Sequence, residues 1–126
     1  MKSLRATEDD EQEAVITYCK LLGIDAIHCP NEGKRSYQYG ARMKRMGMQK
    51  GFPDLFFPYA RKNAHGLFIE MKAEKGKATV EQIEWLRRLK ERDYKAFLCY
   101  GFDEAKRVID WYFEGGDGRV ETERKV

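Results

Sequence analysis

Apolar residues recur along the first part of the chain at a helical spacing and later in short runs typical of strands. A first helix is predicted from about Glu8 to Leu22, with Thr7 as its cap and Gly23 ending it. Its first turn is acidic, which the helix dipole favours. The predicted buried face of this helix consists of Val15, Tyr18, Cys19 and Leu22.

The rest of the chain alternates between short strands and helices. Strands are predicted over residues 24–29, 55–57, 66–72 and 95–100, several of them bounded by Gly or Pro. A helix capped by Thr79 would bury Ile83, Leu86 and Leu89, and a last helix over residues 102–113 has one apolar face. Apart from one short helix near residues 41–46, the order is α-β-β-β-α-β-α. It predicts an α/β fold with a mixed sheet flanked by helices.

Length and composition limit the choice of protein class. The chain has 126 residues, enough for one domain, which we expect over residues 1–113, followed by a polar, flexible tail at 114–126. No apolar run approaches the roughly 20 residues that cross a bilayer, and the first residues are too polar and acidic for a signal peptide. Three cysteines without a CxxC pair fit reduced thiols. We expect a cytoplasmic protein with no membrane partner.

Two carboxylates and one ammonium are predicted to converge on one point. Glu70 and Lys72 are two residues apart, so on a strand they point to the same face. Asp54 lies beside Glu70 if the strand at 55–57 pairs with that at 66–72. Two neighbouring carboxylates repel unless a cation joins them, and oxygen ligands suit Mg²⁺ or Mn²⁺. With Lys72 to orient water or neutralise developing charge, this pattern predicts metal-assisted phosphodiester hydrolysis.

A second interpretation of Glu70 and Lys72 is open, because such a pair occurs by chance on the solvated face of many strands. The preceding residues 67–69 are all apolar, however, which is typical of a central strand buried on both sides. A GFPD turn at residues 51–54 lies at the right distance upstream. We therefore favour the catalytic interpretation.

Four motifs, in this order, resemble the VRR-NUC (virus-type replication-repair nuclease) domains of the PD-(D/E)XK superfamily, of the stand-alone phage or bacterial type. They are PNEGKR at residues 30–35, GFPD at 51–54, GLFIEMK at 66–72 and Glu-Gln at 81–82. The resemblance runs from about Thr7 to Phe113. One departure is Met-Gln-Lys at residues 48–50, where members often carry arginines. This departure concerns DNA contacts from the turn and not the metal site.

The resemblance implies a restriction-endonuclease-like α-β-β-β-α-β core and a nuclease that uses Mg²⁺ or Mn²⁺. Asp54, Glu70 and Lys72 would form its catalytic centre. Asp54, Glu70 and the backbone carbonyl of Met71 would hold the metal. No organic cofactor is implied.

The resemblance also implies an acid on the first helix, for which Glu8 and Glu11 both qualify by helical spacing. Glu8, four residues before Gln12, sits where the acid usually falls, and it would bind the metal directly or through water. The alternative for both acids is that the carboxylate only interacts with the helix dipole. Gln82 also has two interpretations, since a capping box with Thr79 explains it fully and the resemblance adds an active-site role.

A basic segment precedes the GFPD turn. Residues 33–53 contain no acid, and Tyr37 and Tyr39 interleave with the basic residues. Basic side chains neutralise phosphates and tyrosines stack on unpaired bases. Acids elsewhere reduce the net charge to +3, which understates this patch. A solvated loop with incidental charge is the alternative. The predicted DNA contacts are Asn31, Lys34, Arg35, Arg42, Lys44, Arg45 and Lys50.

These features favour a metal-dependent DNA endonuclease that is selective for DNA structure, such as a four-way junction resolvase in replication, repair or recombination. A structure-tolerant nickase or restriction-like nuclease is the alternative within this class. A catalytically dead DNA-binding module would tend to have lost one of the three central residues. A small-molecule α/β enzyme would need a Gly-rich phosphate loop after a strand, and the sequence has none.

The last helix bears on oligomeric state. A single active site cuts one strand at a time, so paired cuts in a two-fold junction would need a homodimer. Aromatic residues in this helix either form a dimer surface or close the core of a monomer, and both interpretations stay open at this point. They are Phe102, Trp111, Tyr112 and Phe113.

Overall fold

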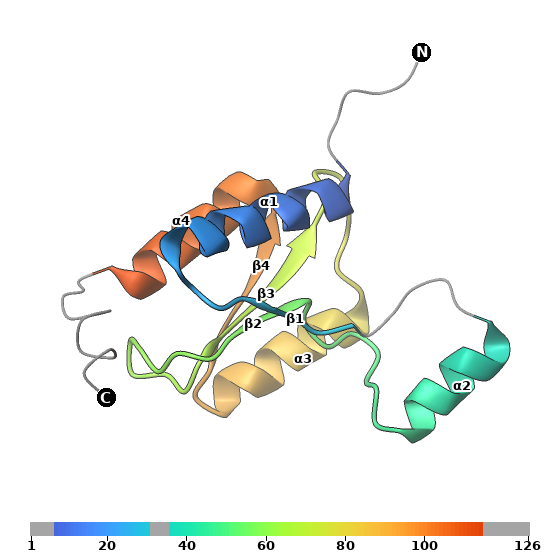
Figure 1. Ribbon diagram of the computed structural model, residues 1–126. Helices are drawn as coiled ribbons and strands as arrows, with labels where there is room; N and C mark the ends of the chain where they lie inside the picture. The colour runs from blue at the N-terminus through green and yellow to red at the C-terminus, as the bar shows by residue number, and fades with distance from the viewer. Residues whose placement is uncertain (1–6, 31–35, 115–126) are drawn as a thin grey trace, which may run out of the picture.

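The computed structural model describes residues 7–30 and 36–114. Helices and strands alternate along this part of the chain (Figure 1). In order they are α1 (Glu8–Leu22), β1 (Ile27–His28), α2 (Tyr37–Arg45), β2 (Leu55–Phe57), β3 (Leu67–Lys72), α3 (Val80–Glu91), β4 (Lys95–Tyr100) and α4 (Gly101–Phe113).

The strands form one mixed sheet in the order β1-β2-β3-β4. β2 runs antiparallel to both β1 and β3, whereas β3 and β4 are parallel and joined through α3. This arrangement confirms the predicted α/β fold with a mixed sheet and flanking helices. The short helix predicted between the first two strands is also present, as α2.

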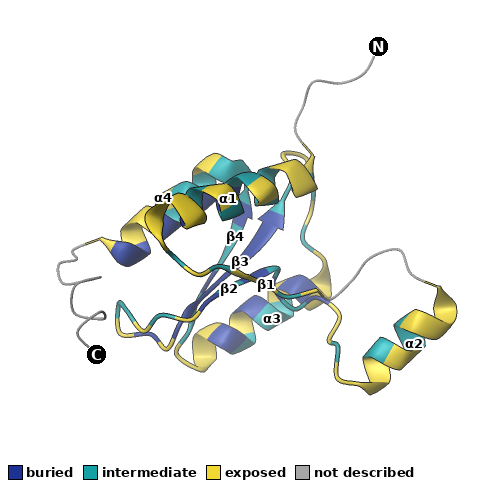
Figure 2. Ribbon diagram, in the orientation of Figure 1, coloured by how far each residue is buried: buried dark blue, intermediate teal, exposed yellow. Residues whose placement is uncertain are grey.

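Alternate residues of β3 serve two separate cores. Leu67, Ile69 and Met71 are fully buried and belong to the core that α1 and α4 cover. Phe68 packs instead with the buried leucines of α3. Figure 1 shows α1 and α4 on one side of the sheet and α3 on the other, and Figure 2 shows the strands buried between them. β3 is therefore the central strand that its apolar run predicted.

Three details of the prediction were wrong. Ile83 is 51% exposed, because the face that α3 turns to the sheet is centred on the buried side chains Gln82, Leu86 and Leu89. Leu22 is 50% exposed at the end of α1, whose buried residues are Val15 and Cys19. The strand predicted over residues 24–29 is limited to β1, Ile27–His28.

α2 begins earlier than predicted because the Ser36 hydroxyl accepts a hydrogen bond from the Tyr39 amide and caps it. None of its residues is buried, and it lies to one side of the sheet (Figures 1 and 2).

The aromatic residues of α4 mostly close the core of the chain itself. Tyr112 is fully buried and its hydroxyl donates to the Tyr59 carbonyl, while Phe113 packs edge-on against the Tyr59 ring. Phe102 packs edge-on against Tyr18 of α1. Of the four residues, Trp111 is the exposed one. The structure thus favours the core interpretation for three of the four residues.

Across residues 7–30 and 36–114, none of the helices combines the length and apolar character that a membrane crossing requires.

Candidate active site

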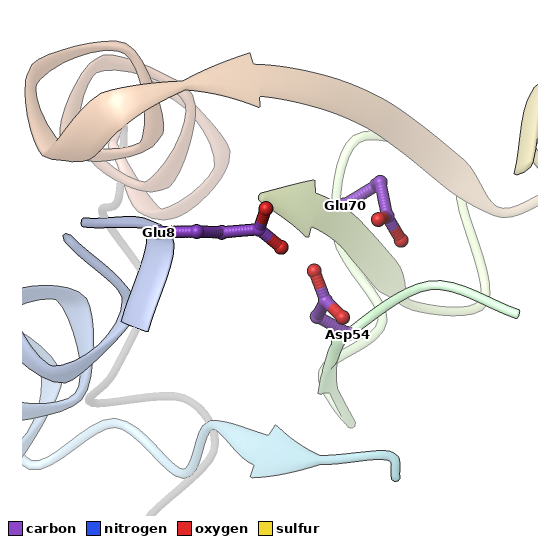
Figure 3. A group of neighbouring side chains, drawn as sticks. All are labelled: Glu8, Asp54 and Glu70. Carbon is purple, nitrogen blue, oxygen red and sulfur yellow. The ribbon is translucent and has the colours of Figure 1, made fainter. Parts of the chain in front are cut away.

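Three carboxylates from different elements converge at one end of the sheet. Glu8 comes from the first turn of α1, Asp54 from the turn before β2, and Glu70 from β3 (Figure 3). One oxygen from each lies within 4.8 Å of the others. The predicted acids are therefore brought together, although Glu8 precedes Glu70 by more than sixty residues.

The backbone of β2 and β3 sets the position of Asp54. Leu55 pairs with Ile69 in the antiparallel ladder, so the next position places Asp54 opposite Glu70. The Met71 amide donates a hydrogen bond of 2.8 Å to Asp54 Oδ2, which holds the carboxylate toward β3. This pairing confirms the strand arrangement on which the predicted convergence depended.

The turn before Asp54 is pressed against the start of α3. Gly51 has a φ of +88°, and a Cβ added there would lie 2.7 Å from the Glu81 backbone carbon and Cβ. Only glycine fits so close an approach at a positive φ. The glycine of the GFPD turn therefore allows the turn that carries Asp54 to lie against the first turn of α3.

Gln82 connects the cap of α3 to Glu70. The side chain is 2% exposed, and its Oε1 accepts a hydrogen bond of 2.8 Å from the Thr79 amide. Its Nε2 donates a hydrogen bond of 2.9 Å to Glu70 Oε2. The two interpretations of Gln82 are therefore compatible, because opposite ends of one amide make the two contacts.

Glu70 is 1% exposed, and a buried carboxylate is costly unless other groups compensate its charge. The Gln82 amide supplies a hydrogen bond, and Lys72 Nζ lies 4.0 Å from Glu70 Oε2. The Lys72 side chain is itself only 12% exposed. Glu70 and Lys72 thus lie close together as their spacing predicted, with the ammonium largely shielded from solvent.

Glu8 and Glu11 occupy different places on α1. Glu8 belongs to the acidic cluster, which consists of Glu8, Asp54 and Glu70. Glu11 Oε1 instead accepts a hydrogen bond of 2.6 Å from the Phe102 amide at the start of α4. The α4 cap residue Tyr100 makes no side-chain cap bond, so Glu11 supplies an acceptor there. The geometry therefore favours Glu8 over Glu11 as the helix acid.

A polar cleft of about 520 Å³ opens onto the cluster. Besides Glu8, Asp54, Lys72 and Gln82, its lining includes Gln12 and His28. The sequence alone indicated no role for His28, and Gln12 served only to locate Glu8. The i, i+4 spacing from Glu8 to Gln12 is a signal that could have placed Gln12 at the site.

α2 carries the central part of the predicted basic surface. Arg42, Lys44 and Arg45 fall in its last turn, and its first turn contains no acid. Tyr37 is 87% exposed and Tyr39 is 43% exposed. A hollow of about 1,050 Å³ separates this helix from Phe52 and Trp85.

The other predicted DNA contacts have different outcomes. Lys50 Nζ lies 4.0 Å from the Glu81 carboxylate in an exposed pair, which partly offsets its charge. Asn31, Lys34 and Arg35 lie outside the described residues.

All three cysteines are free thiols. Cys19 and Cys99 lie in the core, and burial raises the pKa of these thiols to about 11 and about 12. Burial, together with the nearby Asp54 carboxylate, also raises the pKa of Cys29. None of them belongs to the acidic cluster in the described part of the chain. Oxygen atoms alone form the candidate metal centre.

Comparisons with known proteins bear on the family of the chain. The model of the VRR-NUC domain family matches residues 32–103. A solved structure described as a VRR_NUC domain protein is similar, with 33% sequence identity and a TM-score of 0.76, covering 90% of this chain and 93% of that chain. No curated protein matches. The matched segment contains Asp54, Glu70 and Lys72, and it spans more than half of the sequence. The chain therefore belongs to the VRR-NUC domain family, whose domains are of the nuclease type.

Proposed function

We propose that this protein is a Mg²⁺- or Mn²⁺-dependent DNA endonuclease with its catalytic centre at Glu8, Asp54, Glu70 and Lys72. The observation that carries the proposal is the convergence of three carboxylate oxygens within 4.8 Å of one another. Such an arrangement is electrostatically unfavourable without a cation, and carboxylate oxygens are the ligands that Mg²⁺ and Mn²⁺ prefer. Family membership supplies independent support for nuclease chemistry.

The donor set fits a hard divalent cation. Glu8, Asp54 and Glu70 would provide side-chain oxygens, and the Met71 backbone carbonyl would provide a further one. The Met71 amide donates to Asp54, and the N–H and C=O of one strand residue point to the same edge of the strand. The Met71 carbonyl therefore faces the edge where Asp54 lies. A bound cation would polarise the phosphodiester and lower the pKa of its water ligand.

The protein's own side chains divide the remaining work. Lys72, with its ammonium 4.0 Å from Glu70, can orient the attacking water or stabilise negative charge developing on the phosphate. Gln82 holds the Glu70 carboxylate in place through its amide. Such outer contacts of a metal ligand fix its orientation and support metal affinity.

We assign DNA binding to α2 and the adjoining basic residues. Arg42, Lys44 and Arg45 can neutralise backbone phosphates, and the exposed rings of Tyr37 and Tyr39 can stack on unpaired bases. We extend this assignment to Asn31, Lys34 and Arg35, which precede α2 in the sequence, and to Lys50, which lies between α2 and the GFPD turn.

The experiment that tests the proposal is cleavage of labelled linear, flap and four-way DNA by purified protein with Mg²⁺, with Mn²⁺ and with EDTA. We expect cleavage in either metal and none in EDTA. Cleavage that survives exhaustive EDTA treatment would contradict the metal centre. DNA binding without cleavage in any metal would support the alternative of a catalytically dead binding module.

Branched DNA is our preferred substrate. The described residues contain one acidic cluster of this kind, which would cut one DNA strand at a time. Two coordinated cuts therefore need two copies of the chain. C2 dimers are the commonest assembly, and their symmetry matches that of a four-way junction. We accordingly propose a homodimer that makes paired cuts. Light scattering at micromolar concentration tests the dimer. A monomer that nicks linear duplex as readily as junctions would leave a structure-tolerant nickase.

A further inference from the structure

His28 lies in the same cleft as the acidic cluster, on the strand next to Asp54. It pairs with Leu55 in the β1–β2 ladder, and the Cys29 amide donates a hydrogen bond of 2.7 Å to the Asp54 carbonyl. Backbone pairing therefore places His28 next to the turn that carries the candidate metal ligand Asp54. The His28 side chain is exposed, so it is accessible to a substrate entering the cleft.

Gln12 determines which nitrogen of His28 can act as a donor. Gln12 Nε2 lies 3.0 Å from His28 Nδ1. In the orientation that the structure gives the Gln12 amide, its nitrogen faces the ring and donates, so Nδ1 accepts and carries no proton. A ring with an unprotonated Nδ1 carries its proton on Nε2. The contact therefore selects the tautomer in which Nε2–H is the donor.

This tautomer fits substrate binding better than metal binding. Nδ1 is occupied by Gln12 and Nε2 carries a proton, so neither nitrogen offers a lone pair to a cation. Among the described residues, the metal-ligand cluster contains Glu8, Asp54 and Glu70 but not His28. A neutral N–H donor in this cleft can bind an anionic oxygen without competing with the metal for the three carboxylates.

We propose that His28 binds a backbone phosphate of the DNA substrate through Nε2–H, and that Gln12 holds the ring in the required tautomer. The proposal rests on the proposed nuclease function and extends it to a further substrate-contacting residue. His28 acts as a neutral donor, in contrast to the cationic side chains Arg42, Lys44 and Arg45 of α2. It adds to affinity at one phosphate close to the cut without adding to the salt dependence of binding.

The first test measures DNA affinity in Ca²⁺, which is expected to support binding without cleavage. A hydrogen bond to a charged group predicts that His28→Ala weakens binding by about 10- to 100-fold with an unchanged salt slope. His28→Gln, which can place an amide N–H near the Nε2 position, should retain more affinity than His28→Asn. The matched control is His65→Ala, at the chain's other histidine in the β2–β3 connection.

A second measurement locates the contact. Replacing one phosphate at a time by a methylphosphonate should reveal a position that costs the wild type affinity but costs His28→Ala nothing further. Gln12→Leu should reduce the coupling at that same position. Nitrogen NMR of the wild-type protein should show the His28 proton on Nε2.

The outcomes separate this inference from the proposed function. If the wild type cleaves DNA but the effects of His28→Ala and every methylphosphonate are additive, the His28 assignment is wrong and the nuclease stands. A proton on Nδ1 would likewise overturn the assignment. If the wild type neither binds nor cleaves DNA, the proposed function itself fails. Thermal unfolding of His28→Ala at the wild-type temperature excludes a folding defect as the cause of its loss of affinity.

Discussion

The side-chain amide of Gln82 caps α3 through its oxygen and binds Glu70 of the candidate metal centre through its nitrogen. Two substitutions can separate these roles. Gln82→Met keeps the length and apolar bulk of the side chain but has no N–H to donate to Glu70. It also removes the oxygen that accepts the Thr79 amide. Thr79→Ala removes only the hydroxyl that accepts a hydrogen bond of 3.1 Å from the backbone N–H of Gln82. It therefore serves as the matched control.

The structure sets the expected size of each effect on stability. Gln82→Met loses a buried hydrogen bond to a carboxylate, which contributes about 1.5–3 kcal/mol. With the weakened cap, the free energy of unfolding should fall by about 2–4 kcal/mol. Thr79→Ala should lower it by about 1 kcal/mol, which is typical of a lost N-cap. Urea denaturation in EDTA measures both values without a contribution from bound metal.

Metal affinity distinguishes the second role of Gln82. Because an outer contact orients the ligand, Gln82→Met should weaken Mn²⁺ binding by about 10- to 100-fold, whereas Thr79→Ala should leave it unchanged. Calorimetric titration of Mn²⁺ into the folded variants provides the measurement. Equal Mn²⁺ affinities for Gln82→Met and the wild type would refute the conclusion that this amide positions Glu70.

Further tests concern the site and the core. Asp54→Asn keeps an oxygen that can accept the Met71 amide, so it should fold normally while cleaving labelled DNA about 100- to 1,000-fold more slowly; a wild-type rate would remove Asp54 from the metal set. Ca²⁺ should support DNA binding in gel shifts but not efficient cleavage, because its longer bonds activate water poorly. Arg42→Ala should lower the log-log salt slope of DNA binding by about 0.9, and an unchanged slope would argue against a phosphate contact. Cys19 and Cys99, whose pKa values are raised by burial to about 11 and about 12, should resist alkylation at pH 8 until urea unfolds the chain, and rapid reaction in native buffer would contradict their burial.

The same two thiols give stability a dependence on pH. Their pKa values in the folded protein lie above the ordinary value of 9.0, so the folded state holds these protons more tightly than the unfolded state. Their contribution is fully present below pH 9 and is lost as the pH rises toward the folded values. The free energy of unfolding, followed from pH 8 to pH 11, should therefore decline less in Cys99→Ala than in the wild type.

Local patterns predicted the parts of this site that depend on neighbouring residues. The two-residue spacing of Glu70 and Lys72 determines their common face on any strand. The apolar run before Glu70 indicated a strand buried on both sides, and β3 is the central strand between the two cores. Once β2 pairs with β3, Asp54 must lie near Glu70.

Contacts between distant segments could not be predicted in the same way. Helical spacing alone did not choose between Glu8 and Glu11, because the choice depends on where α4 begins relative to α1. Ile83 was predicted to be buried because it is apolar, yet the contact with Glu70 brings the polar Gln82 to the buried face of α3. The role proposed for His28 depends on Gln12, which is sixteen residues away on another element.

The measurement that tests the central claim most directly is anomalous diffraction from crystals of the protein grown with Mn²⁺. It locates the cation without reference to sequence or family. A single site with Glu8, Asp54 and Glu70 as its protein ligands would place a strong anomalous peak between their carboxylates. We expect that peak. Its absence from the cluster in crystals that bind Mn²⁺ elsewhere would contradict the assignment of these three acids as the metal centre.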